Sequence, residues 1–450
     1  MVRLRNCLII NTSIDMNETP KVTVIIPVKD RKDYLYHTLR TCTAQDYENF
    51  EIIVADDAST DGTQDMVRKM AAMDSRITLI DRPERVGMRD NFEDALSRIT
   101  DGYVLALGGD DGILPRGISR MVRKFKETGT KLMTWSTPEY AYPMDYWPNG
   151  HFSIPYRNKS HWVNSREYHA RQTTMLAYIN DKECPMFYIK GAVHISLVNA
   201  VKARTSDGRF YSCPTPDGYS GIVLAGEVDR YYYSEEPFTI NGVSPSSQGI
   251  AYVRKDKKAV ENSKEFFKFS ENKMMHPVLA SQPYSPLLSL MTVDYLMTAK
   301  DLPEWKGFVP EIDFKEVLRK GIGEMARSYA DNRMERELLI MEEIAKLHNI
   351  VDEYHDMLRK AKKYAVSRMD YKTAITKERI YLDVCEVDVH NIFDASYAAY
   401  DLYKLKDKLG LKFYIKAFKR SLEIYRMKKS VYRGDFSEEL KMLENTNKEK

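Results

Sequence analysis

Long hydrophobic runs are absent from this 450-residue sequence. No apolar stretch reaches the roughly 20 residues that a membrane-spanning helix needs. The apolar stretch close to the first residue is also shorter than the hydrophobic core of a secretory signal. We therefore expect neither a membrane span nor a signal peptide, and we predict a cytoplasmic location.

Cysteine is scarce as well, with five residues in the whole chain. They are far apart, odd in number and never form a Cys-x-x-Cys pair, which argues against a disulfide framework and a zinc knuckle. The cysteine content therefore predicts a protein of a reducing compartment.

An excess of one charge is also missing, since 68 Lys and Arg residues face 65 Asp and Glu residues, for a net charge of +3. Such a balance argues against a dedicated nucleic-acid-binding protein. Hydrophobic residues make up 43% of the chain and charged residues 30%, so a sizeable core can form beneath a hydrated surface. At roughly 150 residues per domain, the length allows two or three domains.

The first third of the sequence alternates short apolar runs with amphipathic segments. Five runs have the length and β-branched content of strands, and four segments between them have helical spacing. The predicted strands are Val22–Ile26, Glu51–Ala55, Ile77–Ile80, Tyr103–Leu107 and Leu132–Trp135, and the predicted helices are Asp30–Thr43, Asp61–Met73, Asn91–Ile99 and Leu114–Lys126. This alternation predicts βαβ units, and therefore an α/β fold with a mainly parallel sheet flanked by helices.

The character of the sequence changes twice after this region. Residues 138–255 are rich in Pro, Gly, Tyr and Trp, which predicts loops and short antiparallel strands at the edge of the sheet. Charged, amphipathic helices are expected in the remainder. We therefore divide the chain into an N-terminal extension (1–20), an α/β domain (21–255, with halves 21–137 and 138–255) and an all-α C-terminal domain (256–450).

One segment of the C-terminal region, residues 340–361, has heptad spacing. Its apolar residues follow one another at intervals of four and three, flanked by Glu and Lys. They are Ile340, Ile344, Leu347, Val351, Tyr354, Leu358 and Ala361. The seam predicts either a coiled coil with a second copy of the chain or an antiparallel bundle within one chain.

Two further helices are expected at Val389–Leu409 and Leu411–Lys429, both rich in tyrosine. Basic stretches in this region, among them Lys416–Lys429, alternate with aromatic residues. Such stretches either lie on an anionic membrane surface or form an ordinary hydrated face.

Acidic residues follow three of the predicted strands directly. Strand one ends in Pro27-Val28-Lys29-Asp30, strand two in Asp56-Asp57-Ala58-Ser59, and strand four in Gly108-Gly109-Asp110-Asp111-Gly112. In an open α/β sheet these strand ends share one rim, where ligands bind. Carboxylates gathered on a dry rim repel one another, and solvent, hydrogen-bond donors or a divalent cation must relieve this repulsion. Mg²⁺ and Mn²⁺ are suited to it because both prefer oxygen ligands.

Helix capping remains an alternative role for Asp56 and Asp61. It explains Asp110 and Asp111 less well, because capping needs one carboxylate and the neighbouring glycines indicate a close backbone approach. The rim is therefore interpreted as functional.

Four segments contain these strand ends and the helices that follow, namely KVTVIIPVKDR, FEIIVADDASTDGT, ERVGMRDNFEDAL and DGYVLALGGDDGILP. In this order and spacing they resemble the GT-A-fold glycosyltransferases of family 2, over roughly residues 20–250. The resemblance implies a Rossmann-like GT-A domain that moves a sugar from a nucleotide diphosphate sugar to an acceptor with inversion of configuration.

The resemblance also implies roles for individual residues. Pro27 and Asp30 edge the nucleobase pocket, Asp57 hydrogen-bonds the base, Asp110 faces the ribose, Asp111 binds the metal, and Arg89 and Asn91 lie near the sugar diphosphate or simply begin a helix. The base is usually uracil in this family, which makes a UDP-sugar the expected donor. The family often has an aromatic-Asn pair where this chain has Lys29-Asp30, so stacking at residue 29 is lost.

Inversion requires a base that takes the proton of the acceptor hydroxyl. By the resemblance, an Asp or Glu from a loop beyond the first half of the sheet supplies it. Asp217 occupies that position here, with Glu227 and Asp229 as the next choices. The alternative for Asp217 is a turn between proline and glycine.

The loop region contains two further features. Trp147 and Trp162 either form a platform for an acceptor sugar or simply pack. Residues 240–249, rich in Gly and Ser, either close over the site or connect other elements.

Together these observations predict an inverting, metal-dependent, non-processive glycosyltransferase of surface polysaccharide or glycoconjugate synthesis, since the QxxRW motif of the family's processive enzymes is absent. The expected partners are a nucleotide sugar, a saccharide or lipid-linked acceptor, a second copy of the chain through the C-terminal helices, and the inner face of a membrane, but no nucleic acid. The alternatives are a nucleotidyltransferase and a scaffold that binds a nucleotide sugar without catalysis.

Overall fold

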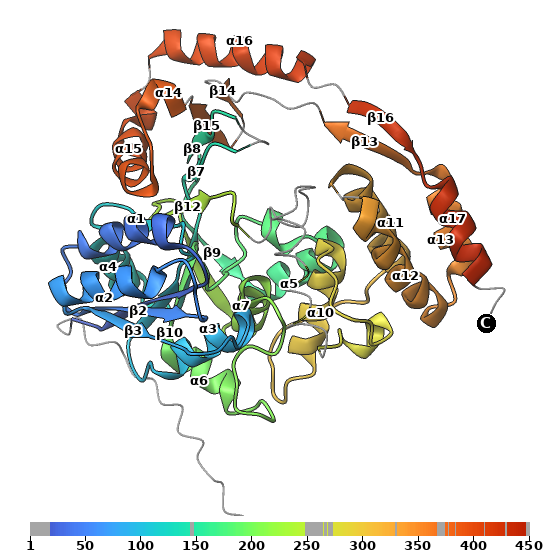
Figure 1. The fold of residues 1–450 in the computed structure, drawn as a ribbon, viewed down its shortest axis with the longest axis horizontal. Helices are drawn as coiled ribbons and strands as arrows, with labels where there is room; N and C mark the ends of the chain where they lie inside the picture. Colours follow the sequence, from blue (N-terminus) through green and yellow to red (C-terminus); the bar gives the residue numbers. More distant parts are fainter. Residues whose placement is uncertain are drawn as a thin grey trace, which may run out of the picture.

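The structure, a computed structural model, describes most of the chain. The described residues are 19–144, 148–247, 264, 268, 273–328, 331–366, 374–376, 378–382, 384–408, 410–427 and 430–446. Figure 1 shows an α/β part in blue and green, with yellow to red helices beside and above it.

The first part of the chain folds into strands and helices in the predicted order. They are β1 (Val22–Val28), α1 (Lys32–Thr43), β2 (Phe50–Asp56), α2 (Thr63–Met73), β3 (Ile77–Ile80), α3 (Met88–Ser97), β4 (Tyr103–Ala106), β5 (Gly112–Ile113), α4 (Gly117–Thr128) and β6 (Leu132–Trp135). Successive side chains of β1 face two different cores, with Val24 and Ile26 in one and Ile25 in the other. The strand is therefore buried on both faces, as a sheet covered by helices on both sides requires.

The main sheet has eight strands in the order β3-β2-β1-β4-β10-β6-β11-β9. It is completed by β9 (His161–Asn164), β10 (Gly191–His194) and β11 (Arg230–Ser234). The first four strands are parallel, whereas β10 runs antiparallel to both β4 and β6. The prediction of a mainly parallel sheet flanked by helices is confirmed.

Residues 138–255 contain more helix than the sequence predicts. Besides the strands, this region forms α5 (Ser165–Met175), η1 (Tyr178–Asn180), α6 (Ile195–Lys202) and α7 (Pro216–Ala225). The α7 helix is buried along nearly its whole length, so its apolar residues have no period that would mark a helix.

A second sheet combines segments that are distant in sequence. Its order is β14-β15-β8-β7-β12-β5, with β7 (Glu139–Ala141), β8 (His151–Pro155), β12 (Thr239–Val243), β14 (Ala374–Ile375) and β15 (Arg379–Leu382). The helix α15 (Ile392–Leu405) packs on α1 and on this sheet. One hydrophobic core contains Tyr140, Ile240 and Ile392, so the C-terminal part of the chain returns to the α/β part.

The helical C-terminal region is present, as predicted, together with short strands that were not. It contains η2 (Pro277–Leu279), α10 (Leu288–Lys300), α11 (Phe314–Ser328), α12 (Asp331–Leu347), α13 (Val351–Lys360), α14 (Val384–Val387), η3 (Lys406–Lys408), α16 (Leu411–Met427) and α17 (Ser437–Thr446). Strands β13 (Lys362–Val366) and β16 (Ser430–Asp435) pair antiparallel. None of the described helices is long and apolar enough to cross a membrane.

The heptad residues do not lie on one continuous helix. The α12 helix ends at Leu347, and Asn349 adopts a left-handed conformation with φ of 56° before α13 begins. Asparagine tolerates this conformation better than most residues. Ile344 and Tyr354 are both fully buried in a core formed by the same chain, so the two halves of the seam pack within one chain.

Candidate functional site

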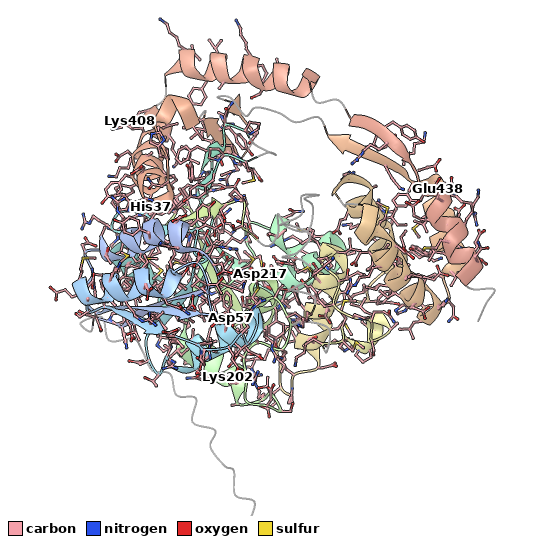
Figure 2. All side chains as sticks on the ribbon, viewed as in Figure 1. His37, Asp57, Lys202, Asp217, Lys408 and Glu438 are labelled. Carbon is pink, nitrogen blue, oxygen red and sulfur yellow. The ribbon has the colours of Figure 1, made fainter. Side chains whose placement is uncertain are left out.

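A cavity of about 1240 Å³ opens at the carboxyl ends of β1, β2 and β4. Parallel strands end at the same edge of a sheet, which brings residues from separate segments together there. The residues assigned from the sequence that line this cavity are Pro27, Asp30, Asp57, Arg89, Asn91, Asp110 and Asp217. Figure 2 shows Asp57 and Asp217 near the centre of the molecule.

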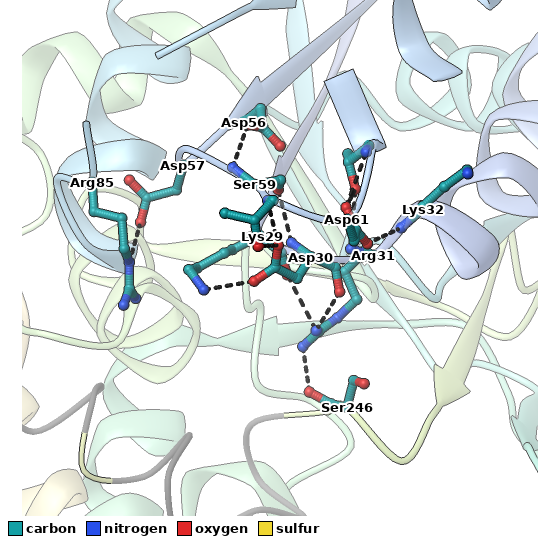
Figure 3. A network of polar contacts seen from close by, with 12 residues as sticks. Lys29, Asp30, Arg31, Lys32, Asp56, Asp57, Ser59, Asp61, Arg85 and Ser246 are labelled. Atoms are coloured by element: carbon teal, nitrogen blue, oxygen red, sulfur yellow. Dashed lines mark hydrogen bonds and ion pairs between the residues drawn. The ribbon is translucent and has the colours of Figure 1, made fainter. Parts of the chain in front are cut away.

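The loop after β1 is held by its own charged residues. Asp30 has a left-handed backbone with φ of 50°, accepts a 2.7 Å bond from the Lys29 ammonium and accepts another from the Thr60 backbone N–H. Burial raises the pKa of Asp30, but these donors outweigh burial and hold the pKa below its ordinary value. Arg31 donates to the carbonyl oxygens of Lys29 and Ser246 (Figure 3). The loop is thus fixed to a segment that follows β12.

The two acids after β2 point to different partners. Asp57, only 4% exposed, accepts the backbone N–H groups of Val86 and Gly87 at 2.7 and 3.2 Å and pairs with Arg85 (Figure 3). Asp56 instead accepts the backbone N–H of Ser59 within its own turn. Asp57 therefore binds the loop before α3 to the cavity wall, and Asp56 does not reach the cavity.

Helix capping, the alternative role for these acids, applies to Asp61. Its carboxylate accepts the backbone N–H of Thr63 at the start of α2 and that of Lys32 at the start of α1, both at 3.0 Å. It thereby satisfies an N–H group at the start of each of two helices. Asp56 does not cap a helix.

The adjacent acids Asp110 and Asp111 occupy different environments. Asp111 is 1% exposed and accepts the backbone N–H groups of Gly108 and Gly242, one on each oxygen, at 2.6 and 2.8 Å. Burial and then the neighbouring Asp110 charge raise the pKa of Asp111 well above its ordinary value. Asp110 lines the cavity and Asp111 does not. The sequence assigned the metal to Asp111, and that assignment stays a prediction; of the two acids, Asp110 is the one on the cavity wall.

The end of β12 holds this acid pair in place. Ser244 and Ser247 donate their hydroxyls to one oxygen of Asp110 at 2.6 and 2.7 Å. A Cβ on Gly242 would lie 1.7 Å from the Asp110 carbonyl oxygen, so only glycine permits this approach. Residues 240–247, one candidate for a closing flap, are therefore a strand and turn bonded to the acids, and 248–249 lie outside the described residues.

Arg89 and Asn91 both begin α3 on the cavity wall. Arg89 donates to Asp90 at 2.7 Å. Asn91 is 2% exposed and donates to the Ala55 carbonyl oxygen at 2.9 Å. Asn91 therefore joins α3 to the end of β2, and the side chain of Arg89 is the more accessible of the two.

Asp217 lies in the first turn of α7, behind Pro216 at the start of the helix. The Tyr178 hydroxyl donates to its Oδ2 at 3.1 Å, while its buried Oδ1 has no hydrogen-bond partner among the described residues. Burial raises the pKa of Asp217, and the Gly218 N–H and the Tyr178 hydroxyl offset part of this effect. A raised pKa and a cavity position suit a carboxylate that exchanges a proton.

Neither of the alternative bases lines this cavity. Glu227 forms an ion pair with Arg204 at 2.5 Å, and Asp229 is exposed. Trp162 is 38% exposed and stacks with Arg230 away from the cavity lining, and Trp147 lies outside the described residues.

Several cavity residues were not found from the sequence. Tyr188 follows no motif, yet burial and then the charges of Asp111, Asp110 and Asp217 raise its pKa well above the ordinary value, so its hydroxyl lies among the acids. The C-terminal half contributes Glu324 and Arg327 of α11 and Arg379 of β15. No motif or regular spacing in the sequence indicates that these residues lie near the strand ends.

The acids of the cavity wall are the residues to consider as ligands of a divalent cation. Within the described ranges, no group of three or more His, Cys, Asp and Glu side chains is placed to hold a metal ion. Asp110 supplies a hard oxygen ligand on the cavity wall. Asp110 is therefore the residue of this wall that would hold a divalent cation.

Part of the chain is similar in sequence to known glycosyltransferases. Residues 23–184 match the family model described as glycosyl transferase family 2. The putative glycosyltransferase EpsE of Bacillus subtilis is 32% identical over 127 residues, which are 27% of this chain and 46% of the relative. The UDP-Glc:alpha-D-GlcNAc-diphosphoundecaprenol beta-1,3-glucosyltransferase WfaP of Escherichia coli is 34% identical over 134 residues, or 30% of this chain and 51% of the relative.

Among solved structures, TarS 1–349 of S. aureus in complex with UDP-GlcNAc aligns with a TM-score of 0.42 and 14% identity. The alignment covers 75% of this chain and 90% of that chain. The chain spans about half or less of the length of the curated relatives that it matches.

Proposed function

We propose that this chain, whose residues 23–184 form a family 2 glycosyltransferase domain, transfers a sugar from a nucleotide diphosphate sugar to a hydroxyl acceptor with inversion. The observation that carries the proposal is one cavity lined both by the strand-end residues Asp30, Asp57 and Asp110 and by Asp217. Donor-binding groups and a candidate base therefore border the same space.

The donor, by this proposal, is a UDP-sugar bound over the ends of β1, β2 and β4. Asp57 and the loop before α3 face the base, and Arg89 lies beside the diphosphate. A divalent cation, Mg²⁺ or Mn²⁺, would be held by Asp110 and the diphosphate and would stabilise the negative charge of the leaving group. Tyr188 and the backbone N–H groups that bind Asp111 support the cavity wall next to the cation.

Asp217 acts, by the same proposal, as the base. A base must be ionised before the acceptor hydroxyl gives up its proton. Because burial raises the pKa of Asp217, its carboxylate is a stronger base than an ordinary Asp. The transfer rate should consequently rise with pH as Asp217 loses its proton.

By this proposal, the acceptor enters the cavity on the side that is lined by Glu324, Arg327 and Arg379 of the C-terminal half. The name of the E. coli relative specifies a diphosphoundecaprenol-linked sugar, and we extend this lipid-linked class of acceptor to the present chain. Such an acceptor is held in a membrane, so we place the enzyme on the inner face of that membrane. Association of two copies through the C-terminal helices remains a prediction, for which exposed Leu347 is the residue to change.

The test compares Asp217→Asn with Asp229→Asn in the full chain, using release of nucleoside diphosphate from a panel of nucleotide sugars. Asp217→Asn should lower turnover by about 100-fold or more while donor binding stays near that of the unchanged protein. Asp229→Asn, exposed and away from the cavity, should leave both unchanged. Loss of donor binding in Asp217→Asn would instead assign this residue to the donor site, and unchanged turnover would contradict its role as the base.

A further inference from the structure

The helix α16 (Leu411–Met427) exposes its large apolar side chains. Leu411, Ile415, Phe418 and Leu422 are 75%, 48%, 59% and 41% exposed. Their intervals of four, three and four place them on one stripe of the helix. Figure 1 shows α16 along the outer edge of the molecule, so the stripe lies at the periphery.

A neighbouring side of α16 attaches the helix through small and polar groups. Ala417 is buried, and the Ser421 hydroxyl donates to the Ile375 carbonyl oxygen at 2.7 Å and accepts the Ile375 N–H at 3.0 Å. Tyr414 donates to the Lys406 carbonyl oxygen at 3.1 Å. A surface helix usually turns its large apolar side chains to the core, whereas those of α16 stay largely exposed.

Basic residues accompany the stripe. Lys412 and Lys419 are exposed, and each follows a stripe residue by one position. The sequence of α16 contains five Lys and Arg residues and a single Glu. Apolar side chains bordered by cations are typical of a helix that lies flat in the interface of an anionic membrane.

Three residues of the stripe, Ile415, Phe418 and Leu422, line a groove of the same character. It has a volume of about 780 Å³, and its wall includes Tyr156, Ile375 and Phe418. Two cations, Arg157 and Lys419, also border it. An apolar groove with cations at its border suits an acyl chain that carries an anionic headgroup.

We infer that α16 is a docking surface for an anionic phospholipid membrane, with the stripe in the acyl boundary and the lysines at the headgroup phosphates. A second copy of the chain is a poorer occupant. A symmetric pairing of two α16 helices would bring Lys412 and Lys419 of both copies together, and their like charges would repel. The inference does not depend on sugar transfer, because the surface is defined by α16 alone.

The test is flotation of the full chain with vesicles of phosphatidylcholine alone, or of phosphatidylcholine and phosphatidylglycerol in equal parts. We expect binding to the mixed vesicles that is at least about tenfold stronger than to the neutral ones and that weakens with salt. Ile415→Asp with Phe418→Asp should weaken it at least about tenfold, and Lys412→Glu with Lys419→Glu should remove the preference for anionic vesicles.

Met73→Asp is the matched control, because Met73 on α2 is 78% exposed and far from α16 in sequence. It should bind as the unchanged protein does. Circular dichroism verifies folding of each variant, and the single change Leu422→Asp replaces the double variant if that one does not fold.

Absence of binding to mixed vesicles would overturn the inference, as would binding that survives Ile415→Asp with Phe418→Asp. Light scattering provides a further check. A dimer that separates in the same double variant, without vesicle binding by the unchanged chain, would assign the stripe to a second copy.

Discussion

At the scale of single residues, the two neighbouring acids after β4 illustrate how adjacent identical side chains acquire different roles. Asp110 faces the cavity with help from two serine hydroxyls, whereas Asp111 turns inward to two backbone N–H groups. A carboxylate can accept one N–H on each oxygen, and an amide has a single acceptor oxygen. The two positions should therefore respond differently to the same substitution.

We predict that Asp111→Asn lowers the free energy of unfolding by about 1–3 kcal/mol, because one buried N–H group loses its acceptor. Asp110→Asn should instead lower turnover and its dependence on Mg²⁺ or Mn²⁺, with a smaller effect on stability. Denaturant unfolding and nucleotide release, measured on both variants, check this. Equal losses of stability in the two variants, or a metal response lost only in Asp111→Asn, would contradict it.

The part of the site that follows strands could be predicted from the sequence. Asp30, Asp57 and Asp110 each come directly after a recognisable apolar run, so the topology of the sheet brings them together. Which of two adjacent acids faces the cavity could not be predicted, because it depends on β12, whose Gly242 is more than 130 residues away in sequence. Tyr188 and Arg379 are likewise placed by tertiary packing and belong to no local pattern.

At the scale of elements, one helix caps another. The Glu324 carboxylate of α11 accepts the backbone N–H groups of Leu288 and Ser289 at 2.7 and 3.0 Å. These are the first two residues of α10, whose own N-cap residue provides no side-chain hydrogen bond. Burial raises the pKa of Glu324 to about 7, against the opposing effect of the two N–H groups.

This shift predicts a pH dependence of stability. The ordinary pKa of Glu is 4.5 and the folded value about 7, so between these values the folded state holds a proton that the unfolded state has lost. The contribution of Glu324 is therefore present below about pH 4.5 and is lost as the pH rises through 7, by up to about 3 kcal/mol. In Glu324→Gln, which has no titrating group, the fall in unfolding free energy between pH 5 and pH 8 should be smaller than in the unchanged protein.

Denaturant unfolding at several pH values measures this difference. Glu343→Gln is a suitable control, since Glu343 is on the neighbouring α12 helix and pairs with Lys346 near the surface. An identical pH profile for the unchanged protein and Glu324→Gln would contradict the assigned protonation.

The heptad segment shows why element boundaries were harder to predict than element type. Most of its seven apolar positions pack, since Ile344, Tyr354 and Leu358 are fully buried, but Leu347 is 49% exposed. The break at Asn349 was missed, since an asparagine within a heptad pattern is compatible with either a continuous helix or a turn. The apolar spacing continues across the turn because both helices face the same core.

At the scale of the whole molecule, the α/β part and the C-terminal part share a core. Ile392 of α15 is fully buried in the cluster that also contains Leu114, Tyr140 and Ile240. The four tryptophans all lie between residues 135 and 305, so their fluorescence reports on the regions before α15. A substitution in α15 that shifts this fluorescence transition would therefore show that the two parts unfold together.

We predict that Ile392→Ala lowers the unfolding free energy reported by tryptophan fluorescence by about 2–4 kcal/mol, because it leaves a cavity in the shared core. Tyr397→Ala, at a position on the same helix that is 45% exposed, should change it by less than about 0.5 kcal/mol. A tryptophan transition that Ile392→Ala leaves unchanged would mean that the two parts unfold independently.

The pairing of β8 with β15 also has a consequence for synthesis of the protein on the ribosome. Arg379 of β15 donates to Ser153 of β8 across 226 residues of sequence, and translation adds about 5–20 residues per second. One edge of β8 therefore stays unpaired for about 10–45 s, until β15 has been synthesised. During that time its backbone N–H and C=O groups are accessible to other chains. During this interval the nascent protein can aggregate through the unpaired edge of β8.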